Sequence, residues 1–404
     1  MKRSSYERNS KKQWLRATYS ALLVIALAFT MTACSGNWNR KEIFEANMEE
    51  TLIEITQDFR SIGILTDTAD ITLLPSEDGV CRVLAKDHKK IQYTATVENE
   101  TLKIRSADTR KWHERIFNLA SPSLTVYLPA EEYAALSIKE STGDVTVGAP
   151  FHFESIDIQL STGDIDLGAS ATDFIKLKGS TGKITVQNVN CSSLNAIVST
   201  GNITINELNC TGDVYLESST GDVLLTDISC KNFTSTAGTS DITLKNLRAS
   251  ENASIERSTG DVNITDAVCS GNLALTASTG KITLDRTSCE GDLSITLSSG
   301  RTYLTDVGCK NLTTVANTGD LEMTNVLADE TLSIKRSTGD VTFNGCDATD
   351  IVITTDTGDV KGTLNSGKIF TVRTDTGRID VPDNTLGGTC KITTDTGNVR
   401  IQIP

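Results

Sequence analysis

The sequence predicts an all-β protein, a parallel β-helix or β-solenoid with about fourteen coils of 19–20 residues. A Ser-Thr-Gly-Asp turn recurs at that interval through the last two thirds of the chain, and apolar residues alternate with polar ones on both sides of each turn. The chain also has 29 glycines but only six prolines and 5% aromatic residues, which suits short strands joined by tight turns. A single unit of this kind cannot bury its apolar face, so the recurrence predicts stacked coils.

Residues 1–34 are predicted to be an export signal or a membrane anchor. Residues 1–16 have a net charge of +5, and residues 17–33 form an uncharged, largely apolar run. The small residues followed directly by Cys34 resemble a bacterial lipobox, in which Cys34 would be lipidated, although Met31 stands where leucine is usual. An uncleaved single span stays open as the alternative, because an apolar run of this length can do either. Both place the rest of the chain outside the cytoplasm and attached to the cell membrane.

The remainder of the chain is strongly acidic. The whole chain has a net charge of −14, so the part from Cys34 onward carries −19. Such a body repels phosphate backbones, and we therefore expect no nucleic-acid partner.

Residues 35–134 are less regular and are predicted to form an N-terminal cap and the opening coils. Residues 42–54 suit either a short helix or a capping strand. Residues 81–84, 91–97 and 101–104 read as a meander of strands. A cap is expected here because the bare end of a solenoid would expose unpaired sheet edges.

Residues 135–404 form the regular part of the predicted solenoid. The second residue after each turn glycine is Val, Ile or Leu except at Thr302, and the fourth is apolar except at Gly362. This alternation predicts strands with one buried face, joined by a corner whose positive φ needs glycine. A looser corner must then close each coil. The turn position is filled, in order, by Gly143, Gly163, Gly182, Gly201, Gly221, Ser240, Gly260, Gly280, Gly300, Gly319, Gly339, Gly358, Gly377 and Gly397.

Several of these features resemble a known bacterial family. Leu128-Pro129, the Leu136-Ser137-Ile138 strand, the Ser141-Thr142-Gly143-Asp144 turn and its recurrence are similar to the adhesin-like DUF4097 (LiaG-like) family. The resemblance covers about residues 55–404. It implies a β-helix-like surface domain, and it supplies no reaction and no catalytic residue.

Six cysteines occupy one position on successive coils, nine residues after the turn glycine. A ladder of buried, reduced thiols is one interpretation, because cysteine packs as a small apolar side chain. Disulfide bonds or a metal site stay open, since stacked strands bring equivalent Cα atoms within disulfide range. The six are Cys191, Cys210, Cys230, Cys269, Cys289 and Cys309.

Three late turns read Asp-Thr-Gly and begin at Asp356, Asp375 and Asp395. The same tripeptide marks aspartic proteases, but these need two carboxylates facing each other across a cleft between two lobes. Here the three residues occupy the slot that earlier coils fill with serine. Together with Asp359 they form a weak candidate site for Ca²⁺, and the alternative is a solvated acidic edge.

The composition favours recognition over catalysis. The chain has only three histidines, and it lacks a Gly-x-Ser-x-Gly elbow or a phosphate-binding loop. We predict a non-catalytic, adhesin-like recognition or scaffold protein, with an envelope-stress system as one suitable setting. Its expected partners are the membrane, through the N-terminus, and an unidentified envelope or extracellular protein or glycan. Apart from the Ca²⁺ candidate, no cofactor is expected. The alternative is a carbohydrate-active β-helix enzyme similar to a polysaccharide lyase, which needs carboxylates and basic side chains clustered in a groove.

Overall fold

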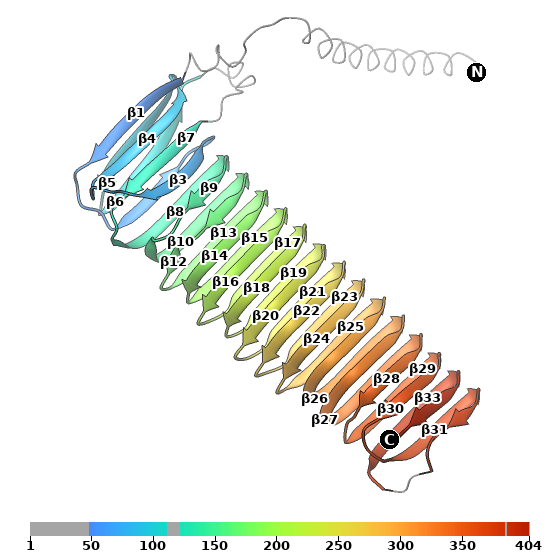
Figure 1. Cartoon of the computed structure of the whole chain (residues 1–404). Helices are drawn as coiled ribbons and strands as arrows, with labels where there is room; N and C mark the ends of the chain where they lie inside the picture. Colours follow the sequence, from blue (N-terminus) through green and yellow to red (C-terminus); the bar gives the residue numbers. More distant parts are fainter. Residues whose placement is uncertain (1–47, 111–121, 384–385, 404) are drawn as a thin grey trace, which may run out of the picture. The chain divides into compact units, whose positions relative to one another are not determined.

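A computed structural model describes residues 48–110, 122–383 and 386–403. The chain divides into two units, of which the second, Glu49–Pro404, is compact. The signal or anchor predicted for residues 1–34, with Cys34, lies outside the described residues. The second unit is a β-solenoid whose strands stack in one file (Figure 1), and its described residues contain no helix. The predicted fold class is therefore confirmed. In the described ranges, no helix is long and apolar enough to cross a bilayer.

The strands alternate between the two sides of the corners. The first group is β1 (Met48–Ile55), β2 (Ser61–Leu65), β3 (Asp70–Pro75), β4 (Cys81–His88), β5 (Ile91–Glu98), β6 (Thr101–Asp108) and β7 (Ser123–Leu128). The first regular coils contain β8 (Glu132–Thr142), β9 (Val145–Val147), β10 (His152–Thr162), β11 (Ile165–Leu167), β12 (Ser170–Ala171), β13 (Phe174–Thr181), β14 (Ile184–Cys191), β15 (Ser193–Thr200) and β16 (Ile203–Cys210).

The central and last coils continue this alternation, except that β26 and β27 each run from one glycine corner to the next. The central strands are β17 (Val214–Thr220), β18 (Val223–Cys230), β19 (Phe233–Thr239), β20 (Ile242–Ala249), β21 (Ala253–Thr259), β22 (Val262–Cys269), β23 (Leu273–Thr279), β24 (Ile282–Cys289) and β25 (Asp292–Ser299). The last are β26 (Thr302–Thr318), β27 (Leu321–Thr338), β28 (Val341–Cys346), β29 (Asp350–Thr357), β30 (Val360–Leu364), β31 (Lys368–Thr376), β32 (Ile379–Asp380), β33 (Gly388–Thr396) and β34 (Val399–Gln402).

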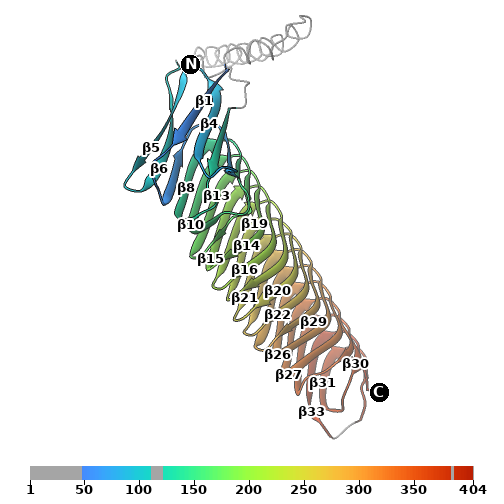
Figure 2. The ribbon, with the colours of Figure 1, turned by 60° about the vertical axis from the view of Figure 1, so that its left-hand side comes forward.

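Equivalent strands of neighbouring coils pair in parallel and in register. β21 pairs with β23 so that Thr259 lies beside Thr279, and β22 pairs with β24 so that Val262 lies beside Ile282. Figure 2 shows the strands of successive coils stacked one after another along the solenoid. The inward side chains of each coil therefore stack on those of the next, and the core is one continuous apolar column.

The corner glycines are required by both backbone conformation and packing. Gly260 has a φ of +131°. A Cβ built on Gly260 would lie 1.9 Å from the carbonyl oxygen of Ser240, the corner residue of the preceding coil. Any side chain would therefore force two coils apart, and only glycine combines this φ with so close an approach.

The aspartate that follows the corner glycine joins one coil to the next. The Asp164 N–H donates to Asp144 Oδ1 over 2.8 Å, and the Asp261 N–H donates to Asp241 Oδ1 over 2.7 Å. Each side chain thus accepts the backbone N–H of the equivalent residue on the next coil. This contact explains why the repeat has Asp or Asn at so many corners, because a carboxylate is a strong acceptor for an N–H that the sheet does not use.

In most coils the strand that follows the glycine corner contains a bend, made by a residue in left-handed conformation, and the looser corner expected from the sequence comes after this strand, as at residues 270–272 between β22 and β23. Six residues after the corner position, eight consecutive coils have φ values between 47° and 58°. Most of these positions hold Asn or Asp, the non-glycine residues that tolerate this conformation best. The residues are Asn188, Glu207, Asp227, Asn246, Asp266, Arg286, Asp306 and Asn325.

The N-terminal strands add a coil that the repeat interval does not reveal. β2 pairs in parallel with β8, β3 pairs in parallel with β9, and Thr68 bridges to Thr142. The corner of this coil is Asp67-Thr68-Ala69-Asp70, with alanine in the glycine position. Beyond it lie β6 and β7, which β5 and β4 cover in antiparallel orientation. The segment that suited a helix or a strand contains β1, a strand.

The last two coils are stacked out of chain order. β33 pairs with β29 on one side and with β31 on the other, so the final coil lies between the two that precede it. The Asn398 N–H accordingly donates to Asp359 Oδ1 over 2.7 Å. Figure 1 shows β31 as the outermost strand. Simple sequential stacking, the default expectation for a repeat, is wrong at this end.

The two exceptions to the apolar pattern, Thr302 and Gly362, each accommodate an unusual side chain of another coil. Buried Arg336 donates from Nη2 to Thr302 Oγ1 over 3.4 Å and from Nη1 to the Gly319 carbonyl oxygen over 3.0 Å. Thr302 is thus polar because an arginine from a later coil reaches it. Gly362 lies beside Phe343, and a Cβ on Gly362 would be 2.7 Å from Phe343 Cδ2 and 1.9 Å from its carbonyl oxygen. The missing side chain makes room for the large ring.

We predict that Gly260→Val destabilises the protein by about 3 kcal/mol or more, because it combines backbone strain with a clash against Ser240. The matched control is Gly308→Val, since Gly308 lies in strand β26 with no atom within 4 Å of its built Cβ. Gly308→Val should change stability by less than about 0.5 kcal/mol. Thermal melts followed by circular dichroism measure both. Equal effects of the two substitutions would contradict the stacked-corner packing.

Candidate functional site

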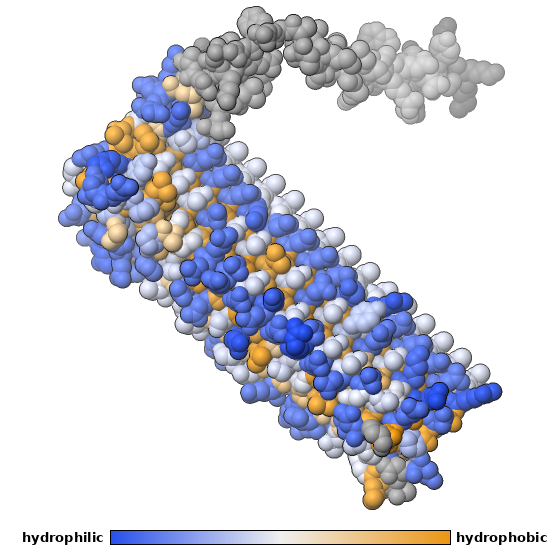
Figure 3. Space-filling view, in the orientation of Figure 1, coloured by the Kyte–Doolittle hydropathy of each residue, from blue (hydrophilic) through white to orange (hydrophobic). Residues whose placement is uncertain are grey.

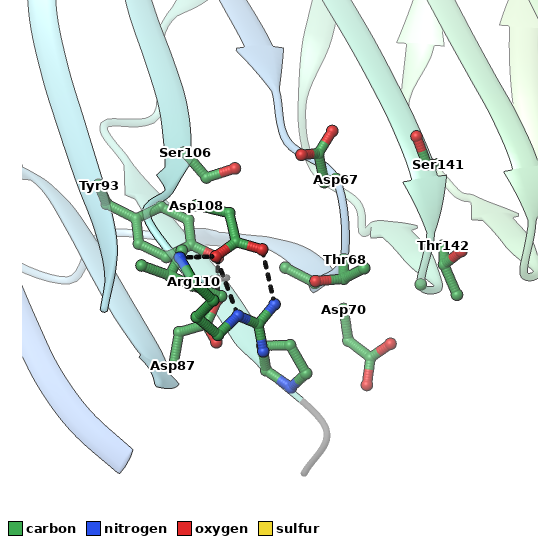
Figure 4. A pocket seen from close by; sticks show the side chains of 14 residues that line it. Asp67, Thr68, Asp70, Asp87, Tyr93, Ser106, Asp108, Arg110, Ser141 and Thr142 are labelled. Carbon is green, nitrogen blue, oxygen red and sulfur yellow. Dashed lines mark hydrogen bonds and ion pairs between the residues drawn. The ribbon is translucent and has the colours of Figure 1, made fainter. Parts of the chain in front are cut away.

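A polar pocket lies where the N-terminal strands meet the first corners. Its volume is about 550 Å³. The lining comes from β4, β5 and β6 on one side and from the corners at residues 67–70 and 141–143 on the other. Figure 4 shows Asp67, Thr68 and Asp70 of one corner facing the group formed by Asp108 and Arg110.

The charged groups in this pocket engage one another. Arg110 forms two hydrogen bonds with Asp108, each of 2.9 Å, and both side chains are largely buried. The Tyr93 hydroxyl donates to Asp87 Oδ2 over 2.8 Å. Burial raises the pKa of Asp87, and burial together with the Asp87 charge raises the pKa of Tyr93. This arrangement suits a joint between cap and solenoid better than a set of free carboxylates.

Glu140 is an acidic side chain inside the first coil, close to the pocket. It is buried, the Thr66 hydroxyl donates to its Oε2, and the Thr142 N–H donates to its Oε1 over 3.4 Å. Burial raises the pKa of Glu140 to about 8, because the low-dielectric interior disfavours the carboxylate. The sequence offered no signal for this residue beyond its place in a position that Leu160 and Val198 fill on later coils.

We predict that Glu140 makes stability fall as the pH rises. The unfolded chain releases this proton near pH 4.5, whereas the folded chain keeps it until about pH 8. The contribution of protonated Glu140 to the free energy of unfolding is therefore fully present below the pKa of the unfolded state. It is lost as the pH rises through the pKa of the folded state. The melting temperature of Glu140→Gln relative to the native chain should increase from about pH 5 to about pH 9. The exposed Glu256→Gln is the control, and an equal trend in both variants would refute the assignment.

The acidic corners proposed as a weak Ca²⁺ site lie on three adjacent coils. Their order along the solenoid is Asp356, Asp395, Asp375, because the final coil is inserted. Asp375 forms an ion pair of 3.0 Å with Arg373, and Asp359 accepts hydrogen bonds from Asn398. Across the described ranges, no three or more His, Cys, Asp or Glu side chains are grouped so that they could hold a metal ion. A Ca²⁺ site at these corners stays an untested prediction.

The cysteines are buried free thiols. Cys191 lies beside Cys210 in register, as Cys269 does beside Cys289, and Ala249 and Ala328 continue the column. Burial raises the pKa of Cys230 and Cys269 to about 12. The pKa values of Cys210 and Cys289 are lowered instead, because each thiolate would accept a hydrogen bond from the neighbouring thiol of Cys191 or Cys309. The free, buried cysteines among the described residues are Cys81, Cys191, Cys210, Cys230, Cys269, Cys289, Cys309, Cys346 and Cys390.

We predict that these nine thiols react with iodoacetamide at least about a hundredfold more slowly in the native protein than after denaturation, because burial keeps the reagent away from the sulfur atoms. Mass spectrometry of alkylated peptides measures the extent at each site. Peptides linked between Cys191 and Cys210 in protein prepared without added oxidant would show that the ladder is disulfide-bonded instead.

The most regular surface feature is a double column of hydroxyls beside the corners, which we call the hydroxyl strip. Each threonine lies in register with that of the next coil, as Thr142 does with Thr162, and these threonines are exposed. Gly238 and Asn317 interrupt the serine column. Figure 3 shows side chains of intermediate hydropathy repeating along one edge of the solenoid. The strip comprises Ser141-Thr142, Ser161-Thr162, Ser180-Thr181, Ser199-Thr200, Ser219-Thr220, Thr239, Ser258-Thr259, Ser278-Thr279, Ser298-Ser299, Thr318 and Ser337-Thr338.

Comparison with solved structures found chains similar to this one. A putative adhesin from Bacteroides fragilis is 14% identical, with a TM-score of 0.25, and the match covers 88% of this chain and 97% of that one. A putative cell adhesion protein from Clostridium sporogenes is 8% identical, with a TM-score of 0.21, covering 59% and 99%. A putative lipid binding protein from Parabacteroides distasonis is 13% identical, with a TM-score of 0.18, covering 88% and 97%. These values carry no argument about function.

The sequence match to a protein family is more informative. A search of curated proteins found no match. The family model described as Toastrack DUF4097 matches residues 59–214, 191–305 and 292–404, which together span most of the chain and all of the regular coils. The resemblance drawn from the Ser-Thr-Gly-Asp turns is thereby confirmed, and the chain belongs to the Toastrack DUF4097 family.

Proposed function

We propose that the protein is a non-catalytic recognition module of the cell surface, whose hydroxyl strip binds an extended, uncharged glycan. The observation that carries the proposal is the in-register column of exposed hydroxyls on successive coils. A small ligand needs an enclosed pocket, whereas a polymer can use one weak contact per coil and sum them along the solenoid.

The chemistry of the strip favours an uncharged, hydroxyl-rich partner. Serine and threonine hydroxyls both donate and accept hydrogen bonds, as sugar hydroxyls do. The part of the chain from Cys34 onward carries −19, so its field opposes anionic polymers. Coils spaced by about 4.8 Å place the hydroxyls at a regular interval, and the eleven coils of the strip extend them over roughly 50 Å.

The proposal includes attachment to the membrane through the N-terminal segment, by lipidation at Cys34 or by an uncleaved span of residues 17–33. A solenoid held in this way would present the strip to the cell envelope or its surroundings, where an envelope-stress system could use the same contact. The lyase-like alternative is weaker, because Arg110 and Asp108 already pair with each other in the pocket where carboxylates and an arginine meet.

We predict that Thr259→Val with Thr279→Val weakens binding of the full chain to uncharged polysaccharides by about tenfold, since each substitution removes a hydroxyl and keeps the β-branched shape. The matched control is Thr243→Val with Thr283→Val, on outward positions of β20 and β24 away from the strip. Affinity electrophoresis in gels containing dextran, starch or, as the anionic counterpart, alginate measures the effect.

Two results would contradict this function. One is equal weakening by the strip variant and its control. The other is a native chain that binds alginate more tightly than every uncharged polysaccharide, because the acidic body should repel it.

A further inference from the structure

The coil formed by β31 and β32 ends the solenoid, and its outer edge is unpaired. β31 is in register with β33 on its inner side, and β32 pairs with β34. Among the described residues, no strand pairs with the outer side of either one. The backbone N–H and C=O groups of this edge are therefore available to another strand, which is the situation that natural sheets usually avoid.

No segment among residues 48–110, 122–383 and 386–403 covers the apolar core at this end. Ile379 is 48% exposed, whereas Val360 and Val399, at the equivalent position of the two coils beneath it, are 0% exposed. Phe370, Val372 and Val381 also take inward positions but are only half-buried, and they pack against the core beneath. In a solitary chain, the last layer of the apolar column faces water.

Ile369 enlarges this apolar end. It is 44% exposed and is the second residue of β31. The equivalent residues of inner coils are polar, as in Asn252, Asn272 and Asn311. An apolar residue in a position that the repeat otherwise keeps polar indicates that this end is covered by another surface.

The opposite end of the solenoid is built differently. There β4 and β5 run antiparallel to the strands they cover, so they close the column with a reversed strand direction. The two ends are not alike, and head-to-tail stacking of copies would require one to match the other. A two-fold arrangement uses the same face on both copies and needs no second surface.

The charges at this end also favour a second copy. Residues 368–383 contain three basic and three acidic residues and are neutral, within a body that carries −19. Net charge therefore does not oppose a contact between two copies through this face. Arg373, Asp375, Arg378 and Asp380 alternate in sign along the edge. An antiparallel pairing of two such edges can place a positive side chain of one copy beside a negative one of the other.

We propose that the outer face of the last coil, formed by β31 and β32, binds the same face of a second copy, so that the protein forms a tail-to-tail dimer. The contact joins the two unpaired edges and covers Ile369, Phe370 and Ile379. It is independent of glycan binding, because the hydroxyl strip lies along the side of the solenoid and the contact lies at its end.

The test is sedimentation velocity of the full chain in a density-matched mild detergent, across micromolar concentrations. The native chain should be dimeric. Ile379→Lys should raise the dimer dissociation constant by about 100-fold, because a two-fold contact contains the substitution twice. Ile369→Asn should raise it by about tenfold without affecting the fold, since inner coils carry asparagine at that position. Circular dichroism checks that each variant is folded.

Leu224→Lys is the matched control, because Leu224 is also 48% exposed but lies on the side of the solenoid in β18. It should leave the dissociation constant unchanged. A native chain that stays monomeric throughout the concentration range would overturn the proposal. A dimer that tolerates both Ile379→Lys and Ile369→Asn, or that Leu224→Lys weakens equally, would overturn it as well.

Discussion

The close approach of successive corners is the constraint on which the rest of this structure depends. The carbonyl oxygen of one corner occupies the space in which the next corner would place a Cβ, as at Gly260 and Ser240. Glycine at this point lets the parallel strands on both sides of the corner keep their register. The carboxylate after the glycine, as at Asp144, then accepts a hydrogen bond from the backbone N–H of the next corner. Register, in turn, aligns every inward side chain with its equivalent and creates both the apolar column and the hydroxyl strip.

A core built as a column responds to irregular residues differently from a globular core. An inward residue contacts mainly its equivalents above and below, so a polar or oversized side chain must be accommodated along the column. Arg336 reaches Thr302, Arg257 donates to Ser235 Oγ over 3.0 Å, and Gly362 makes room for Phe343. Burial lowers the pKa of both arginines to about 10. Each of these departures from the repeat is therefore accompanied by a second one that accommodates it, on a coil one or two positions away.

The ends of the column present the opposite problem, since stacking leaves one face of the first and last coils without a neighbour. Antiparallel strands β4 and β5 solve it at the beginning, and the buried pair of Asp108 and Arg110 lies where they meet the first corners. At the other end the final coil is inserted beneath β31, which leaves Ile379 uncovered. Function at the side of the solenoid and association at its end can thus be separate properties of one repeat.

The coil could be predicted from the amino-acid sequence, because the turn interval and the two-residue alternation are local consequences of corner geometry and of a sheet buried on one face. Thirteen glycines and the residues flanking Ser240 therefore placed every regular corner. Where that interval fails, the neighbouring coils are known from the strand pairing in the folded chain. The coil at Ala69 pairs with one 74 residues later, and β33 is inserted between β29 and β31. Backbone hydrogen bonding accepts any parallel partner, so chain order does not dictate stacking order at the ends. Likewise, the pocket around Arg110 and the raised pKa of Glu140 arise from burial between segments distant in the chain, which no local pattern records.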